Sequence, residues 1–462
     1  MKVQSIQLRH SCHFSDLKIK FNPLKQPVCL ILGNQASGKT TILKNIYHSL
    51  SWFSARLKDL RTAGIIMLDT EIKNKTVQSK IDISVIYPTE IGLIENPDQV
   101  EPTNDYSCSW QLFKTLTSQG LGHSKVQTVQ LESLIALYLE AIKQDPLQGL
   151  PLIAYYPSDR FINEINLLSK NNPAVLQIQA AYELSPLPYT TFARFFEWFR
   201  EISDIEHARL AQIFQRYQSN AIQDSENLKS LNPTQDTDFN AKFLALEADL
   251  QLPSLKTLKD AVNTIFPSIT DIYIDYSPKI QLMVCEHGVA TPFVQLSNSQ
   301  RQWICLIGDV VRRLCILNPQ SMTPCLDGDG ILIIDNIDSQ MDEDLQQNIL
   351  SKLHAVFPRV QIIASACSEL LLSNDLDFQY LKIEHQNIIE IPHKQLHHQY
   401  DELYAQLLNS PVVELEEQQI QDQLFESESI RLFEQFKTLN DAEKYQFMQY
   451  IQRGDFPSIS ST

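Results

Sequence analysis

Residues 33–40 have the types and spacing that could hold the phosphate groups of a nucleotide. They read GNQASGKT and fit the pattern G-x-x-x-x-G-K-[ST]. In this pattern backbone N–H groups curl around phosphate oxygens, the lysine places a cation on the β and γ phosphates, and the hydroxyl reaches Mg²⁺. The expected phosphate ligands are Gly33, Asn34, Gln35, Ala36, Ser37, Gly38, Lys39, Thr40 and Thr41, with Thr40 also on the metal.

The segments on either side of this loop predict the elements that must position it. The apolar run PVCLIL, residues 27–32, predicts a buried strand, and residues 40 to about 60 have the apolar spacing of a helix. The N-terminus of such a helix carries a partial positive charge that would face the phosphates. The alternative is a strand–helix turn with a surface lysine, but both flanking elements favour the phosphate site.

An acidic strand end further along the chain predicts the metal side of the same site. Residues 330–338 read GILIIDNID, in which four apolar residues precede Asp335. A buried strand that ends in a carboxylate beside a nucleotide holds Mg²⁺ through water in the Walker B arrangement. An ordinary strand end with an acidic turn is the alternative, and the presence of the loop favours the metal role.

The position after Asp335 decides whether water can be activated there. Asn336 has an amide side chain, which can hold a water molecule but cannot accept its proton at neutral pH. Loss of a general base lowers a rate by about 10²–10⁴. Asp338, two residues further on, is the candidate substitute, although strand alternation complicates its direction.

A capped helix precedes the acidic strand. LSNSQ, residues 296–300, resembles the ABC signature LSGGQ and opens an amphipathic helix. A serine at a helix start can cap the helix and donate to an anion. In ABC-type heads the signature closes over the γ-phosphate of the opposite subunit, so the resemblance implies this role for Ser297, Ser299 and Gln300. A merely capped core helix is the alternative.

These segments together resemble one group of ABC/Rad50-like AAA-family ATPases. GNQASGKTTILKNIYHSLSWF, IAYYPSDR, FFEWFRE, LSNSQRQWICLIGDVVRRLCILNP and GILIIDNID occur in the order found in the PtuA-type ATPase subunit of Septu and retron-linked anti-phage defence systems. The resemblance covers roughly residues 1–375. It implies heads that form homodimers or larger homo-oligomers around ATP, and an HNH nuclease partner that the nucleotide state holds or releases. It also matches Arg160 to a family arginine, with a structural or a functional role.

Two departures from the family concern hydrolysis. The resemblance implies a catalytic glutamate where this chain has Asn336, and a switch histidine after the last core strand. The corresponding text is IIASACSELLLS, where Ser365 and Cys367 stand near the histidine's place. We therefore expect an ATPase with slow or absent turnover.

Composition sets wider limits. The chain has 462 residues, 43% of them hydrophobic and 20% charged, and a net charge of −17, which argues against a sequence-wide nucleic-acid coat or an anionic membrane partner. The eight cysteines are scattered without a CxxC pair, and we interpret them as reduced core residues of a cytoplasmic protein. No apolar run is long enough for a membrane span.

The predicted fold class is α/β: an ABC-type P-loop NTPase head with a mixed sheet and flanking helices, a helical insertion and a helical C-terminal tail. Residues 100–150 are expected to be irregular and then helical. The predicted domains are residues 1–165 with the phosphate loop, 166–268 as the helical insertion, 269–395 with the signature and Walker B strand, and 396–462 as an acidic helical tail. That tail is either a partner-docking surface or a solvated face.

The predicted function is an ATP- and Mg²⁺-binding, nucleotide-gated oligomeric regulator of a nuclease partner in anti-phage defence. The candidate partners are a second copy of the chain, an HNH nuclease subunit, and nucleic acid or a reverse transcriptase–DNA complex. The first alternative is an active RecF/Rad50-like ATPase that acts on DNA ends in repair or defence. The second is a scaffold that no longer binds nucleotide, which the complete phosphate loop disfavours.

Overall fold

The computed structural model of the chain describes most of its first 392 residues. They are residues 1–94, 106–117, 122–145, 147–162, 167–168, 170, 174–183, 189–190, 192–227, 252–339, 341–372 and 378–392; for 189–190, 214 and 216–227 only the backbone is described. The chain separates into two units, Met1–His397 and His398–Thr462. The predicted acidic tail lies outside the described residues, so everything below concerns the first unit.

A six-stranded sheet forms the centre of this unit, in the order β16–β15–β3–β14–β13–β7. Neighbouring strands from β15 to β7 run parallel, and within this sheet β16 alone is antiparallel to its neighbour. The strands are β3 (Val28–Leu32), β7 (Leu152–Tyr156), β13 (Gly330–Ile334), β14 (Val360–Ala366), β15 (Phe378–Glu384) and β16 (Asn387–Glu390). Every residue of β3, β13 and β14 is buried, because helices cover both faces of the sheet.

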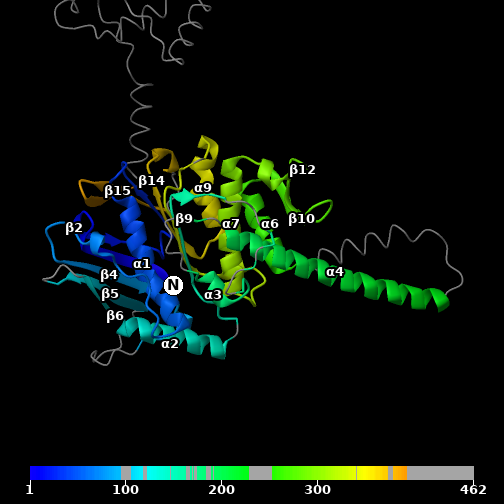
Figure 1. Cartoon of the computed structure of the whole chain (residues 1–462), viewed down its shortest axis with the longest axis horizontal. Coiled ribbons are helices and arrows are strands. Elements are labelled where there is room, and N and C mark those ends of the chain that lie inside the picture. The colour runs from blue at the N-terminus through cyan, green and yellow to red at the C-terminus, as the bar shows by residue number, and fades with distance from the viewer. Residues whose placement is uncertain are drawn as a thin grey trace, which may run out of the picture. The chain divides into compact units, whose positions relative to one another are not determined.

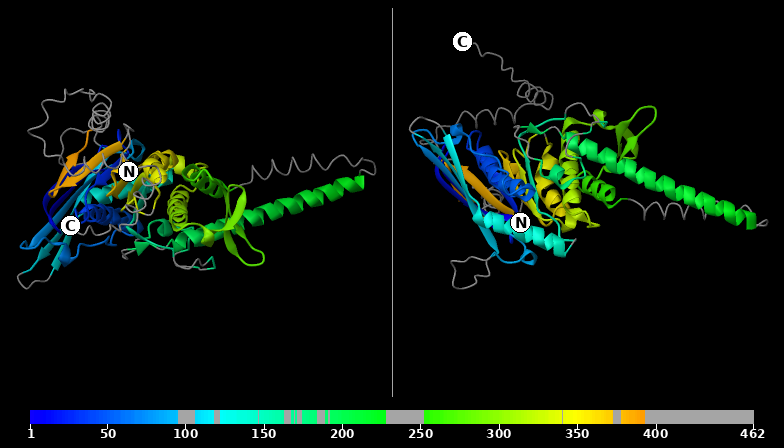
Figure 2. Two further views of the ribbon diagram at one scale, coloured as in Figure 1. Left: turned by 90° about the horizontal axis from the view of Figure 1, so that it is seen from above. Right: turned by 60° about the horizontal axis from the view of Figure 1, so that its bottom comes forward.

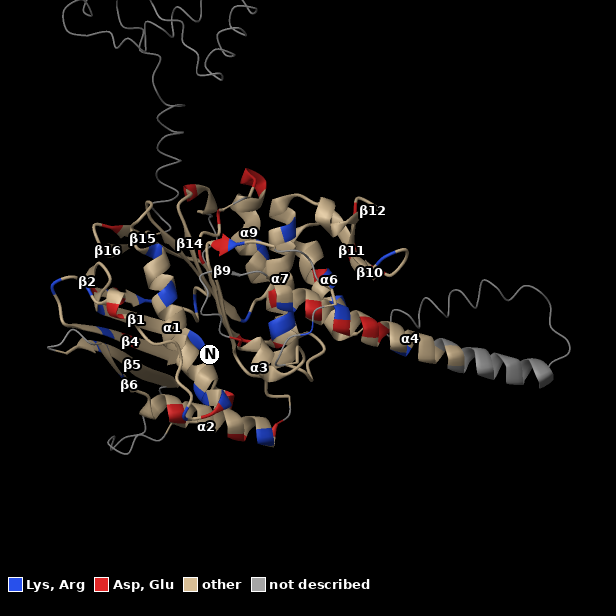
Figure 3. Cartoon of the chain, in the orientation of Figure 1, with Lys and Arg blue, Asp and Glu red and all other residues tan. Residues whose placement is uncertain are grey.

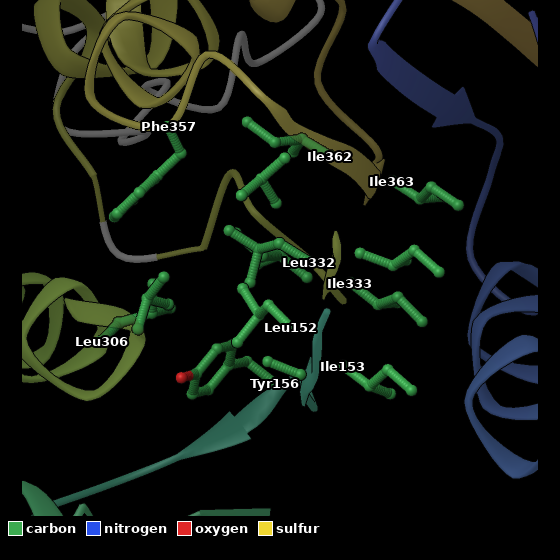
Figure 4. Close-up of a cluster of buried hydrophobic side chains, with 14 of the residues drawn as sticks. Leu152, Ile153, Tyr156, Leu306, Leu332, Ile333, Phe357, Ile362 and Ile363 are labelled. Atoms are coloured by element: carbon green, nitrogen blue, oxygen red, sulfur yellow. The ribbon is translucent and has the colours of Figure 1, made fainter. Parts of the chain in front are cut away.

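The core lies on both sides of this sheet. Figure 4 shows Ile153, Ile333 and Ile363 pointing to one side of the strands, and Leu152, Leu332 and Ile362 pointing to the other. On the second side they meet Leu306, in the helix Asn298–Leu317, and Phe357, which directly follows the helix Glu343–Val356. The α/β class and the mixed sheet with flanking helices are thus confirmed.

A second, antiparallel sheet has the order β2–β1–β4–β5–β6. Its strands are β1 (Lys2–Ser11), β2 (Phe14–Lys20), β4 (Gln78–Ile86), β5 (Ser107–Leu116) and β6 (Gly122–Gln127). Buried and more exposed residues alternate along β4 and most of β5, as in a sheet with one covered face. The expectation of irregular structure after residue 100 was wrong for β5 and β6: Cys108, Trp110 and Leu112 alternate as strand residues do, whereas β6 is polar.

Helix α1 (Lys39–Lys58) joins the two sheets. It contacts β7, β13 and β14 of the central sheet as well as β4 of the antiparallel sheet. The indole N–H of Trp110 on β5 donates to the carbonyl of Ser49 at 3.0 Å. Helix α2 (Val129–Gln144) then packs on α1 and β5. The helix predicted over residues 40 to about 60 is therefore confirmed, and it is buried on several sides.

The other face of the central sheet carries most of the remaining helices. They are α3 (Ile178–Ala181), α6 (Pro253–Ile265), α7 (Asn298–Leu317), α8 (Pro324–Asp327) and α9 (Glu343–Val356). Single 3₁₀ turns occur elsewhere in the chain at η1 (Asp69–Glu71), η2 (Thr89–Ile91), η3 (Phe293–Gln295) and η4 (Glu369–Leu371). A small sheet of β10 (Ile269–Asp275), β11 (Gln281–Glu286) and β12 (Val289–Pro292) precedes α7, and β8 (Asp159–Arg160) pairs with β9 (Tyr189–Thr190).

A buried charge cluster holds α7 to the central sheet. Asp309 accepts hydrogen bonds from the Arg312 and Arg313 side chains at 2.8 and 2.9 Å and from the Tyr156 hydroxyl at 2.8 Å. Burial alone would raise the pKa of Asp309, but the two arginines outweigh it and hold the pKa below its usual range. The carboxylate therefore stays charged and fixes α7 against β7.

Helix α4 (Ala193–Asn227) is the longest helix among the described residues, with 35 residues, or about 50 Å. Its first turns pack on α7, where a Cβ on Gly308 would come within 2.2 Å of the Phe195 ring. The remainder extends away from the packed elements (Figure 1), at the opposite end of the unit from the antiparallel sheet (Figure 2). The first half of α4 carries interspersed charges of both signs (Figure 3). No described helix is both long and apolar enough to cross a membrane.

Candidate nucleotide-phosphate site

The loop between β3 and α1 has the backbone shape that binds anions. It begins at Gly33, directly after the buried strand, and ends at Gly38, the N-cap residue of α1. Ala36 and Gly38 have φ angles of 60° and 101°, in the left-handed region. Alternation of left- and right-handed residues turns successive N–H groups toward one centre, and here that centre lies at the N-terminus of a 20-residue helix.

Gly38 is required for both its conformation and its lack of a side chain. A Cβ at this position would approach His13 Nε2 at 2.3 Å and the Phe14 ring at 2.6 Å. Both neighbours come from the β1–β2 hairpin, so the antiparallel sheet closes directly onto the phosphate loop. This contact between segments about 25 residues apart follows from the packing of the sheet on α1, and the loop motif alone did not predict it.

Gly38→Ala is expected to destabilise the protein more than Gly288→Ala does. Both glycines have positive φ angles, of 101° and 79°, but a Cβ on Gly288 meets nothing within 4 Å. The control change therefore costs only the conformational strain, about 1–2 kcal/mol, whereas Gly38→Ala adds a steric conflict with the hairpin. Urea unfolding of the two full-length variants measures the difference, and equal free energies of unfolding would contradict this account.

The side chain of Lys39 lies across the mouth of the loop. Its Nζ donates to the carbonyl oxygens of Gly33 and Asn34 at 2.5 and 2.9 Å and contacts Cys367 Sγ at 3.3 Å. The residue is only 7% exposed. The structure thus brings together the loop lysine and Cys367, one of the two residues that stand near the expected place of a histidine.

Thr40 and Asp335, the two residues expected to hold Mg²⁺, form a hydrogen bond with each other. Thr40 Oγ1 donates to Asp335 Oδ2 at 2.7 Å, and Asp335 Oδ1 accepts from Ser365 Oγ at 2.5 Å. Asp335 is fully buried at the end of β13. A hydroxyl and a carboxylate oxygen at the rim of a phosphate-binding loop are the oxygen donors that Mg²⁺ prefers, so these residues fit the metal.

The turn after Asp335 holds Asn336 in a left-handed conformation, with a φ angle of 51°. Its N–H donates to Ser365 Oγ at 3.0 Å, and its carbonyl accepts from Arg160 at 3.0 Å. Asparagine tolerates this conformation better than most residues do. Its backbone is therefore fixed, and its side chain is partly exposed beside the metal-side carboxylate.

Asp338, the candidate substitute base, is engaged elsewhere. Its Oδ2 accepts hydrogen bonds from the backbone N–H groups of Cys367 and Ser368, both at 2.8 Å. The carboxylate thus joins the turn after β13 to the turn after β14. This geometry favours a positioning role over proton transfer.

Arg160 forms a structural clamp behind the site. Its guanidinium donates to the carbonyl oxygens of Pro157, Asp335 and Asn336 and to Ser339 Oγ, at distances from 2.6 to 3.0 Å. Its own carbonyl accepts from Gln302 of α7 at 2.8 Å. Burial lowers the pKa of Arg160, and nearby Asp335 opposes this change. The clamp connects the turn after β7, the turn after β13 and the helix that follows the signature.

The signature residues form the predicted helix cap. Ser297 Oγ accepts from the Gln300 N–H at 3.1 Å, and Gln300 Nε2 donates to Glu286 of β11 at 2.8 Å. Ser297 is exposed and Ser299 is partly exposed at the N-terminus of α7. Helix capping is therefore confirmed, and the role toward a neighbouring subunit stays a prediction.

The chain is similar in sequence to known proteins. A family model described as AAA domain matches residues 5–269. The chain is 25% identical over 420 residues to "Retron Vc95 probable ATPase" of Vibrio cholerae serotype O1 biovar El Tor, covering 82% of this chain and 75% of that protein. It is 26% identical over 398 residues to "Retron Ec83 probable ATPase" of Escherichia coli, covering 80% and 69%.

Solved structures with a similar chain path are more distant. The Smc head domain with an extended coiled coil bound to the C-terminal domain of ScpA, derived from Pyrococcus furiosus, has a TM-score of 0.45 and 10% identity, covering 87% of this chain and 99% of that one. The recombination mediator protein RecF-ATPrS has a TM-score of 0.37 and 14% identity, covering 84% and 98%.

Proposed function

The chain belongs to the AAA domain family, and from that premise we propose that it is an ATP-binding, ABC-type ATPase subunit with weak or absent hydrolysis. In this proposal its nucleotide state gates an oligomer that regulates a nuclease partner in anti-phage defence. One observation carries the proposal. The loop lysine and the Thr40–Asp335 pair, 2.7 Å apart, are in place, whereas Asn336 follows the carboxylate.

The loop and its neighbours would hold the nucleotide. The N–H groups of Gly33–Thr41 and the ammonium of Lys39 would bind the phosphates, and Thr40 and Asp335 would bind Mg²⁺, the latter through water. When bound, Mg²⁺ would neutralise charge on the β and γ phosphates. Lys39 lies at the loop and Thr40 contacts Asp335, so the described residues support nucleotide binding whether or not ATP is hydrolysed.

The groups around the γ-phosphate position support slow hydrolysis. Asn336 cannot accept a proton at neutral pH, and the Asp338 carboxylate already accepts two backbone N–H groups. Ser365 donates to Asp335, and Cys367 contacts Lys39. These contacts leave the site with ligands for a triphosphate and without a free carboxylate next to Asp335 in the described part of the chain.

The similarity to two retron probable ATPases over about four-fifths of the chain supports a retron-linked role. In this proposal Ser297, Ser299 and Gln300 contact the γ-phosphate of a neighbouring copy. The partner would be an HNH nuclease subunit, with nucleic acid or a reverse transcriptase–DNA complex as a further component.

Native mass spectrometry tests the gating. Addition of ATP and Mg²⁺ is expected to give one nucleotide per subunit and to shift the chain to dimers or larger homo-oligomers. Ser299→Arg should keep the nucleotide and lose the shift, because the side chain of residue 299 is partly exposed at the start of α7. Ser109→Arg, on the exposed face of β5, is the matched control and should behave as the wild type.

The outcomes separate the parts of the proposal. ATP occupancy without a change in subunit number would reject gating by oligomerisation. DNA-stimulated hydrolysis at an ordinary ABC ATPase rate would reject slow turnover and favour the RecF/Rad50-like alternative.

A further inference from the structure

The β1–β2 hairpin places an imidazole at the phosphate loop. His13 lies in the two-residue turn between the paired residues Ser11 and Phe14. The turn is fixed by its neighbours: the Cys12 N–H donates to the carbonyl of Glu71, and the Lys73 N–H donates to the carbonyl of His10 at 2.9 Å. The position of the His13 backbone is therefore set by two strands and by the segment 71–73.

The ring itself is also held in place. The His13 and Phe14 rings pack with centroids 4.0 Å apart, and Phe14 is fully buried. On its other side the imidazole contacts Gly38, since a Cβ there would lie 2.3 Å from Nε2 and 2.6 Å from Cε1. His13 Nε2 is thus next to the last residue of the loop, directly before the first N–H groups of α1.

This nitrogen is buried and has no hydrogen-bond partner among the residues that the structure describes. Buried polar atoms almost always have a partner, which can be protein, ordered water or a ligand. The N-terminus of α1, which begins directly after Gly38, favours an anion beside this nitrogen. A protonated imidazole nitrogen can donate to an acceptor oxygen, and a phosphate group offers several.

We propose that His13 Nε2 donates a hydrogen bond to a phosphate oxygen of the nucleotide held by the loop Gly33–Thr41. This inference rests on the proposed nucleotide site and adds to it a ligand from the antiparallel sheet. The hairpin then has two roles: it excludes any side chain at Gly38, and it supplies a donor opposite the loop. Nucleotide binding would link the antiparallel sheet to the N-terminus of α1.

The test compares two histidines of the same hairpin. His13→Phe keeps a ring against Phe14 and removes the donor, and it is expected to raise the Kd for ATP with Mg²⁺ about tenfold or more in isothermal titration calorimetry. His10→Phe changes an exposed ring three residues away and should leave the Kd within twofold of the wild type. His13→Gln, which keeps a side-chain N–H, should recover part of the affinity and provides a second variant should the phenylalanine disturb folding.

Binding of inorganic tripolyphosphate, which has no base or ribose, tests whether His13 contacts the phosphates. His13→Phe should raise the Kd for tripolyphosphate by the same factor as the Kd for ATP, since the proposed contact is to phosphate. A loss with ATP alone would place the contact on the base or ribose and overturn the proposal. An unchanged Kd for both His13 variants would assign the nitrogen to water and overturn it as well. If the wild type and Lys39→Ala bind ATP equally weakly, the nucleotide site itself fails, which is a distinct result.

Discussion

Lys39→Ala is expected to raise the Kd for ATP with Mg²⁺ by about 10²–10³-fold. The lysine is only 7% exposed, and the carbonyl oxygens of Gly33 and Asn34 hold its Nζ over the mouth of the loop. Removal of a positioned, largely buried cation leaves the β and γ phosphates without their strongest partner. Isothermal titration calorimetry with the full chain measures the change directly.

Lys44→Ala is the matched control for this prediction. Lys44 lies on the same helix, five residues further on, and is partly exposed. We expect the Kd of the Lys44→Ala variant for ATP to stay within twofold of the wild-type value. A Lys39→Ala protein that binds ATP within tenfold of the wild type would contradict the phosphate role of the loop, and with it the proposed function.

Asn336→Glu is expected to raise ATP turnover by about 10²-fold or more over the wild type. The change puts a carboxylate next to Asp335, where a general base can accept a proton from water, and such a base contributes about 10²–10⁴ in rate. The backbone N–H and carbonyl of residue 336 are held by Ser365 and Arg160, so the new side chain starts from a fixed position. Steady-state phosphate release at saturating ATP measures the gain.

Asn336→Gln controls for backbone strain and side-chain length. Residue 336 has a φ angle of 51°, which disfavours glutamate and glutamine about equally, and only the glutamate has a carboxylate. The glutamine variant should therefore hydrolyse ATP no faster than the wild type. Equal rates in the two variants would show that the missing carboxylate does not limit turnover.

The phosphate loop could be predicted from the sequence because its chemistry is local. Its donors are consecutive backbone N–H groups, and the strand before and the helix after it have distinct apolar patterns. Thr40 and Asp335 were expected near the metal because the loop and an acidic strand end are the two parts of the Walker arrangement. Their contact follows from the sheet, in which β3 and β13 run parallel on either side of β14 and end at the same edge.

Contacts made by turns could not be predicted in this way. The position of His13 against Gly38 depends on a two-residue hairpin and on the packing of a whole sheet against α1. The engagement of Asp338 depends on the neighbouring turn after β14. In both cases the partner lies on another element, and no periodic pattern records the contact.

The prediction that the cysteines lie in the core holds for most of them and fails at a strand end. Cys29, Cys108, Cys305, Cys315 and Cys325 are buried, and burial raises the pKa of each thiol. The prediction of a core position was wrong for Cys367, which is exposed at the mouth of the loop. Its strand β14 is fully buried up to Ala366, so the apolar context concealed where the strand ends.

The seating of α4 on α7 has a mechanical consequence. Phe195 packs directly on the backbone of α7 at Gly308, where no side chain would fit, so a tilt of α7 would act on the base of α4. A helix of about 50 Å acts as a lever, so a tilt of about 10° at its base sweeps its far end through about 9 Å. Because Ser297 caps the start of α7, a small reorientation of that end of α7 would be amplified at the far end of α4.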